Sequence, residues 1–62
     1  MNIGKRYEIT TFGKGKGEKG TKFKGMFIAE EKEFYILQHR EGFKECFLKL
    51  DFVTGECKVE EL

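Results

Sequence analysis

The chain has 62 residues, of which 12 are Lys or Arg and 11 are Asp or Glu, and its formal net charge is +1. A domain of this size buries only about 60% of the surface that its unfolded chain exposes, so the length allows one thin core. Seven Phe and two Tyr exclude a disordered chain, because disordered segments are poor in aromatic residues. We therefore expect a single folded domain over residues 1–62, and its small size favours self-association as a further source of stability.

The two parts of the chain differ in charge. Residues 1–25 carry seven Lys or Arg and two Glu, whereas residues 26–62 carry five Lys or Arg and nine Asp or Glu. Such an asymmetry is typical of a protein whose basic part contacts an anionic partner. The same division also serves solubility, so both interpretations stay open.

The N-terminal residues lack the apolar stretch of a signal peptide, and no apolar run approaches the roughly 20 residues that cross a bilayer. We expect a cytoplasmic protein with no membrane contact. Cys46 and Cys57 are then expected to be reduced thiols in apolar surroundings, with no disulfide between them.

Strands are predicted along most of the chain. Alternating apolar and charged residues predict the first strand over residues 5–12. Residues 13–21 are dominated by Gly and Lys, a composition that is typical of a flexible, solvated loop. Further strands are expected over residues 21–29, 34–40, 43–52 and 56–61.

Three turns connect the later strands, at residues 30–33, Glu41-Gly42 and Thr54-Gly55. A helix over residues 29–39 competes with this pattern, but the aromatic and β-branched content of that segment favours a strand. The sequence therefore predicts an all-β domain, a small five-stranded antiparallel meander that forms a barrel of the SH3-like or OB-like kind.

The same turns predict which side chains share a face, because a one-residue slip would turn every side chain of a strand over. Pairing across residues 30–33 sets Met26 against Leu37 and Phe27 against Ile36. Pairing across Glu41-Gly42 sets Leu37 against Cys46, and pairing across Thr54-Gly55 sets Phe52 against Cys57. In this register Cys46 and Cys57 lie too far apart for a disulfide. The predicted core face carries Met26, Ile28, Tyr35, Leu37, Cys46, Leu48, Leu50, Phe52, Cys57 and Val59, with Tyr7 and Ile9 from the first strand.

The opposite face is expected to be apolar as well. It carries Phe23, Phe27, Phe34, Ile36 and Phe47 beside Gln38, Glu45, Lys49 and Lys58. Exposed apolar patches of this extent mark interfaces or ligand surfaces. Three interpretations stay open: an interface between copies of the chain, a contact surface for another ligand, and strands that bend so sharply that both faces are buried.

The segment between the first two strands is rich in lysine. Residues 15–20 match the pattern G-x-G-x-x-G, but a strand follows where a dinucleotide site needs a helix, and Gly20-Thr21-Lys22 has the wrong order for a P-loop. Lysines on a flexible segment neutralise phosphates, and aromatic side chains on an adjoining sheet stack on bases. The candidate nucleic-acid-binding residues are Lys14, Lys16, Lys19, Lys22, Lys24 and Phe23, and the candidate interface or stacking residues are Phe27, Phe34, Ile36 and Phe47.

Residues for catalysis and for metal binding are not predicted to come together. The chain has no Ser, and the predicted register joins no Cys–His or paired-carboxylate group. His39 is expected at a sheet edge beside Lys24 and Lys44, which makes a cationic cluster and a poor metal site. We therefore expect a protein that is not an enzyme and that uses no cofactor or metal.

Residues 23–37 read Phe-Lys-Gly-Met-Phe-Ile-Ala-Glu-Glu-Lys-Glu-Phe-Tyr-Ile-Leu. This segment resembles the first signature of Sm-like proteins, including the bacterial Hfq type: an apolar residue, x-Gly-x, an apolar strand, a short acidic turn and an aliphatic strand. The resemblance implies a strongly bent five-stranded barrel, oligomers formed through strands, and RNA binding. The nucleotide pocket of that family is not implied, because its characteristic residues have no match here.

These observations predict a binding module. The leading prediction is nucleic-acid binding by an oligomeric small barrel, through the Gly/Lys loop and the aromatic face. The alternative is a protein–protein interaction module, such as a regulatory subunit or a phage-type inhibitor, whose contact surface is Phe27, Ile36 and Phe47.

Overall fold

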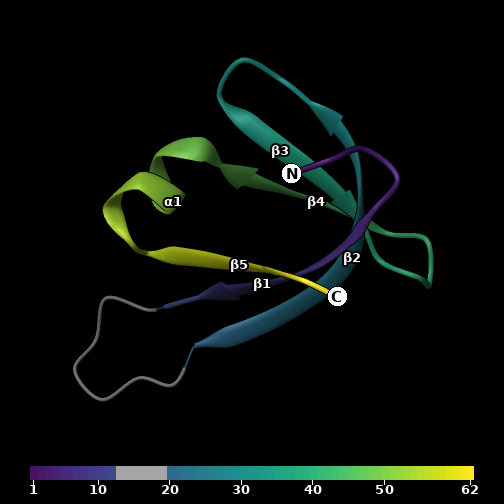
Figure 1. Cartoon of the computed structure of the whole chain (residues 1–62), viewed down its shortest axis with the longest axis horizontal. Coiled ribbons are helices and arrows are strands. Elements are labelled where there is room, and N and C mark those ends of the chain that lie inside the picture. The colour runs from purple at the N-terminus through teal and green to yellow at the C-terminus, as the bar shows by residue number, and fades with distance from the viewer. Residues whose placement is uncertain (13–19) are drawn as a thin grey trace.

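A computed structural model of the chain describes residues 1–12 and 20–62. Within these residues it contains five strands and one short helix, drawn in Figure 1. In chain order they are β1 (Arg6–Thr11), β2 (Thr21–Glu30), β3 (Phe34–Gln38), β4 (Lys44–Leu48), α1 (Lys49–Thr54) and β5 (Cys57–Glu61). No helix of the described part is long and apolar enough to cross a membrane.

The strands form one antiparallel sheet in the order β4-β3-β2-β1-β5. Strands β1 to β4 are neighbours both in sequence and in the sheet, which confirms the predicted meander for these four. The fifth strand lies against β1, at the opposite edge from β4, so the predicted hairpin that pairs Phe52 with Cys57 is wrong. Cys57 pairs with Thr11 instead. No strand pairing joins β4 to β5 in the described residues, so hydrogen bonds do not close the sheet into a barrel.

A short helix replaces the end of the predicted fourth strand. The alternation of Leu48, Leu50 and Phe52 predicts a strand to residue 52, but β4 ends at Leu48 and α1 follows at once. Gly55, expected in a hairpin turn, has a φ of +87° and ends the helix in the left-handed conformation that is common there. The helix leads the chain across the open side of the curved sheet, so that β5 reaches β1 (Figure 1).

The turn between β3 and β4 contains one residue more than predicted. His39 and Phe43 flank it, and the N–H of His39 donates to the carbonyl of Phe43 at 2.8 Å. Gly42, the last of the three turn residues, has a φ of +107°, which favours glycine and suits a three-residue hairpin loop. Leu37 therefore pairs with Glu45, one residue earlier than predicted, and this slip turns the whole of β4 over.

The pairing of β2 with β3 also differs from the prediction. Phe27 pairs with Leu37, whereas its predicted partner is Ile36. An irregularity of the β-bulge type follows between Phe27 and Ala29, after which Ala29 pairs with Ile36. Phe27 therefore shares a face with Leu37.

The core lies on one face of the sheet and draws on all five strands. Phe52 of α1 packs against this core, and its ring lies 5.4 Å from that of Tyr35. The core positions Tyr7, Ile9, Leu37 and Cys57 are confirmed, because all four are buried. Among the described residues, the buried hydrophobic side chains are Tyr7, Ile9, Phe27, Leu37, Phe47 and Cys57, with Met1, Phe23, Tyr35 and Phe52 packed against them.

The two faces are exchanged on β2 and β4 relative to the prediction. Phe27 and Phe47, expected on the outer face, are 1% and 8% exposed and belong to the core. Met26, expected in the core, is 41% exposed. The one-residue differences in pairing are the cause. Further residues expected in the core but found exposed are Cys46, Leu48, Leu50 and Val59.

Both cysteines are free thiols, as predicted. Cys57 is buried, and its Sγ lies 3.5 Å from the Oγ1 of Thr11. Cys46 is exposed. The two residues stand on the two edge strands, β5 and β4, which are separated by the other three strands of the sheet.

We expect Phe27→Ala to unfold most of the protein. Truncation of a buried Phe costs about 3–5 kcal/mol, and a single core in so small a domain rarely supplies more than about 3–5 kcal/mol in total. Met26→Ala, one residue away and exposed, should cost less than about 1 kcal/mol. Urea denaturation followed by circular dichroism measures both variants, and a larger loss at Met26 than at Phe27 would contradict the observed faces.

Candidate anion-binding site

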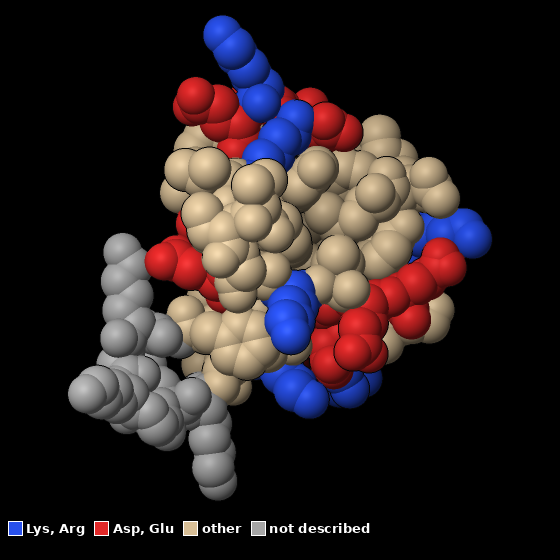
Figure 2. Space-filling model, turned by 60° about the vertical axis from the view of Figure 1, so that its left-hand side comes forward, with Lys and Arg blue, Asp and Glu red and all other residues tan. Residues whose placement is uncertain are grey.

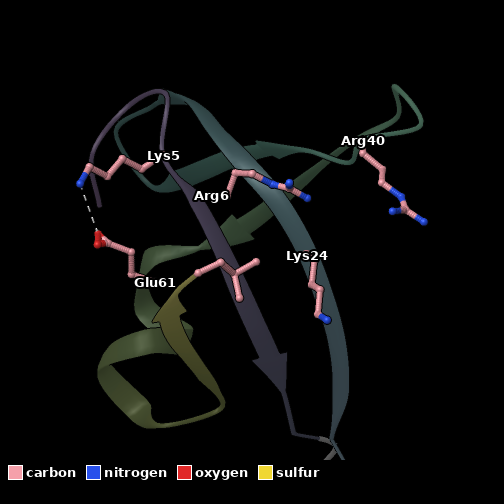
Figure 3. Close-up of a pocket in the computed structure, with 6 residues that line it drawn as sticks. Lys5, Arg6, Lys24, Arg40 and Glu61 are labelled. Atoms are coloured by element: carbon pink, nitrogen blue, oxygen red, sulfur yellow. Dashed lines mark ion pairs between the residues drawn. The ribbon is translucent and has the colours of Figure 1, made fainter.

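Four basic residues line a hollow beside β1 and β2. The hollow has a volume of about 630 Å³. Figure 3 shows the side chain of Arg6 extending toward the side on which Lys24 and Arg40 lie, whereas Lys5 is turned to Glu61. The hollow therefore combines cations from two strands and from the β3–β4 turn. Its complete lining is Lys5, Arg6, Lys24, Arg40, Glu61 and Leu62.

The pairing of the strands brings these cations together. Arg6 in β1 pairs with Met26 in β2, and Lys24 lies two residues before Met26 on the same strand. Side chains in this diagonal relation share a face and lie about 7–8 Å apart, within reach of long side chains. Gln38 at the end of β3 also pairs with Met26, so the turn that follows carries Arg40 to the same region.

Two lysines of β2 share one carboxylate on this outer face. Glu8 points away from the core because its neighbours in β1, Tyr7 and Ile9, point into it. Its two carboxylate oxygens lie 3.8 Å from the Nζ of Lys22 and 3.8 Å from the Nζ of Lys24. The side chains of both lysines are exposed, whereas that of Glu8 is partly buried between them.

The cations around the hollow are only partly neutralised. Lys5 pairs with Glu61, with 3.7 Å between Nζ and Oε1. Neither Arg6 nor Arg40 makes an ion pair with a residue that the structure describes. Exposed ion pairs contribute only about 0–1 kcal/mol, so an incoming anion can replace the carboxylates at the lysines.

The lysines predicted to bind nucleic acid are only in part described. Lys22 and Lys24 lie on the outer face of β2, and Lys24 lines the hollow. The other three, Lys14, Lys16 and Lys19, lie outside the described residues. Two of the five predicted lysines therefore lie on the same side of the sheet as Arg6 and Arg40, two arginines that the prediction does not include.

The predicted aromatic and apolar contact residues do not line the hollow. Phe23 pairs with Ile9 on the inner face, where its ring lies 5.5 Å from that of Phe47. Phe27 and Phe47 are core residues. Phe34 and Ile36 lie on the outer face of β3, where they pair with Leu48 and Cys46 of β4. No base can therefore stack on Phe27 or Phe47 in the folded chain.

His39 has an aromatic neighbour where a cationic one was predicted. The longer turn sets Phe43, and not Lys44, opposite His39, and the two rings stack with centroids 4.4 Å apart. The Nδ1 of His39 accepts a hydrogen bond from the N–H of Glu41 at 3.1 Å. Among the described residues, no group of three His, Cys, Asp or Glu side chains is placed to hold a metal ion.

Sequence reasoning misses Arg6 and Arg40 for a definite reason. A long connection joins β1 to β2, so no short turn fixes their register, and no prediction follows for the neighbours of Arg6. Arg40 lies in a turn whose direction depends on the pairing of β3. The available signal is the order Arg6-Tyr7-Glu8, which places Arg6 and Glu8 on the face opposite Tyr7.

The side chains that line the hollow determine which ligands it can bind. Guanidinium and ammonium groups carry positive charge and donate hydrogen bonds, and a guanidinium group presents a planar fork that fits a phosphate or a carboxylate. The site can therefore hold an anion between Arg6, Lys24 and Arg40. Comparisons of the chain with known protein families, with curated proteins and with solved structures found no match in any of the three.

Proposed function

We propose that this protein is a non-enzymatic binding module for nucleic acid, and that the hollow beside β1 and β2 holds part of the phosphate backbone. The observation that carries the proposal is the convergence of Arg6, Lys24 and Arg40 from three separate segments. Because both guanidinium groups lack an ion-pair partner among the described residues, they are ready to accept an anionic ligand.

A polymer of phosphates fits this surface better than a single anion does. Lys22 extends the basic surface along β2, and Lys44 extends it on the outer face of β4, where it pairs with Gln38. Affinity for nucleic acid rises with the number of phosphates that Lys and Arg neutralise. A band of cations that crosses several strands is therefore the electrostatic pattern expected of a nucleic-acid-binding surface.

The finer fold that we propose is a small barrel of the SH3-like or Sm-like kind that is left open between β4 and β5. Three features support it: β5 pairs with β1, a short helix joins β4 to β5, and the sheet is strongly curved (Figure 1). The segment that resembles the first Sm-like signature corresponds to β2, the acidic turn and β3. That correspondence supports RNA as a candidate ligand.

A second candidate function is contact with another protein or with a second copy of the chain. In α1, Leu50 and Val53 are 64% and 82% exposed. With Leu48, Lys49 and the β2–β3 turn they border a hollow of about 470 Å³. Figure 2, in which the side that carries α1 is turned forward, shows a broad uncharged surface bordered by charged residues. Exposed apolar surfaces of this kind mark interfaces.

Arginine variants test nucleic-acid binding directly. For single-stranded oligonucleotides, Arg6→Gln and Arg40→Gln should each lower the slope of log affinity against log salt by about 0.7, and by about 1.4 together. Lys32→Gln is the matched control, because it removes one positive charge at the β2–β3 turn, away from the hollow beside β1 and β2. Fluorescence anisotropy over a salt series measures the slopes. Absence of binding by the unmodified protein at low salt would contradict the proposed function.

Glu8→Gln should strengthen oligonucleotide binding. The substitution frees Lys22 and Lys24 from their shared carboxylate and removes repulsion between that carboxylate and a bound phosphate. The gain should be several-fold at low salt and should shrink as salt screens the charges. Glu33→Gln, at the β2–β3 turn, makes the same change in net charge and should leave the affinity unchanged. An equal gain in both variants would show a general charge effect and no role for this site.

Leu50→Glu tests the second candidate function. Because Leu50 is exposed, the variant should stay folded, but a charge on the apolar surface should dissociate any oligomer that forms there. Light scattering at several protein concentrations, with circular dichroism as a folding check, measures the effect. An oligomer of unchanged mass in the variant would exclude the α1 surface as its interface.

A further inference from the structure

We propose that Phe43 stacks on a base of the bound nucleic acid, and that the ligand is therefore single-stranded. This inference rests on the proposed function, because it places phosphates in the hollow beside Arg40. The observation that carries it is an aromatic ring left 53% exposed at the β3–β4 turn, which also supplies a cation to the hollow.

Neighbouring rings hold Phe43 in place. Its ring is nearly parallel to that of His39, with centroids 4.4 Å apart and an interplanar angle of 10°. The ring of Phe23, on β2, lies near both of them: its centroid is 6.0 Å from that of Phe43 and 5.7 Å from that of His39. We call these three side chains the aromatic platform. Because the platform is already ordered, a base that adds to it meets a lower entropic cost.

Hydrogen bonds of the turn fix the two stacked rings. The N–H of His39 donates to the carbonyl of Phe43 at 2.8 Å, and the N–H of Gly42 donates to the carbonyl of His39 at 2.8 Å. The N–H of Glu41 donates to the Nδ1 of His39 at 3.1 Å, which orients the imidazole. The ring of Phe43 is therefore positioned by the backbone of the turn as well as by packing.

Phe43 is more exposed than the aromatic side chains around it. Phe47, whose ring lies beside that of Phe23, is buried, and Phe23 is partly buried against the core. His39 stacks on one face of the Phe43 ring, and 53% of the residue is exposed. An exposed aromatic ring offers a stacking surface to a planar base.

The aromatic platform and the proposed phosphate site meet at the β3–β4 turn, the platform on the inner face of the sheet and the hollow on the outer face. Arg40 directly follows His39 in the chain and lines the hollow with Arg6 and Lys24. Base and phosphate are joined within one nucleotide, so a strand with a phosphate at Arg40 can place a neighbouring base on Phe43. The bases of a duplex are already stacked on one another, whereas those of a single strand are open to aromatic side chains. Single-stranded RNA and DNA share this chemistry.

A tryptophan reporter tests the contact. The chain has no Trp, so Phe43→Trp creates a single fluorophore at the aromatic platform. Titration with a short oligothymidylate or oligouridylate should quench its fluorescence to saturation. The control Val53→Trp, on α1, should show no quenching. Binding seen by anisotropy without quenching at Phe43→Trp, or with equal quenching at Val53→Trp, would overturn the inference.

Affinities provide a second, independent measurement. Phe43→Leu keeps apolar bulk but loses the flat ring, and it should weaken binding of these oligonucleotides by about 5- to 150-fold, the usual range for one stacked base. Phe43→Tyr should bind as the unmodified protein does. A deoxyribose-phosphate strand without bases should bind Phe43→Leu and the unmodified protein equally. If Phe43→Leu does not fold, the quenching of Phe43→Trp decides.

The outcomes separate this inference from the proposed function. If Arg6→Gln and Arg40→Gln weaken binding while Phe43→Leu does not, nucleic-acid binding stands and base stacking is wrong. Equal affinity for a duplex and for a single strand would also overturn the inference. If the unmodified protein binds no oligonucleotide at low salt, both proposals are wrong, and the platform is left for a protein ligand. A preference for oligouridylate or for oligothymidylate, with quenching, supports the inference and identifies the nucleic acid.

Discussion

The left-handed backbone of Gly42 allows a three-residue turn between β3 and β4, and the length of that turn determines which side of β4 faces the core. With this length, Phe47 lies opposite Tyr35 and is buried. The same turn stacks Phe43 on its neighbouring imidazole and carries Arg40 to the hollow. A Cβ added to Gly42 would meet no atom within 4 Å, so the positive φ, and not a lack of space, is what favours glycine there. Through the length of its turn, Gly42 affects the packing of the core on one face of the sheet and the position of Arg40 on the other.

The strands could be predicted because aromatic and alternating residues mark them, but their faces could not. In β2 and β4, apolar residues follow one another, as in Met26-Phe27 and Cys46-Phe47, so either side of these strands offers a plausible core. Only the turn length and a bulge distinguish the two registers. The helix α1 has a similar explanation: tertiary contacts support it, among them the N–H of Lys49, which donates to the carbonyl of Glu33 at 2.9 Å. A local alternation of apolar residues cannot reveal such contacts.

The part of the candidate anion-binding site that could be predicted is the part that residue composition reveals. Lys22 and Lys24 are visible in the sequence as part of a basic segment. Arg6 and Arg40 are far apart in the chain, and only the pairing of three strands brings them together. The aromatic contact was expected in the middle of the sheet, but those positions form the core, and the exposed ring lies at a turn. Chemistry could thus be anticipated from residue types, whereas location required the register.

The carboxylate of Glu8 is a counter-ion that is tethered to the proposed binding surface. A free phosphate or mononucleotide competes with it at each encounter, and because the carboxylate is attached to the protein its effective concentration beside Lys22 and Lys24 is high. Successive phosphates of a polymer are also tethered to one another once the first has bound, so they compete on equal terms. Under the proposed function, the two ion pairs of Glu8 therefore favour a polymer of phosphates over a single nucleotide.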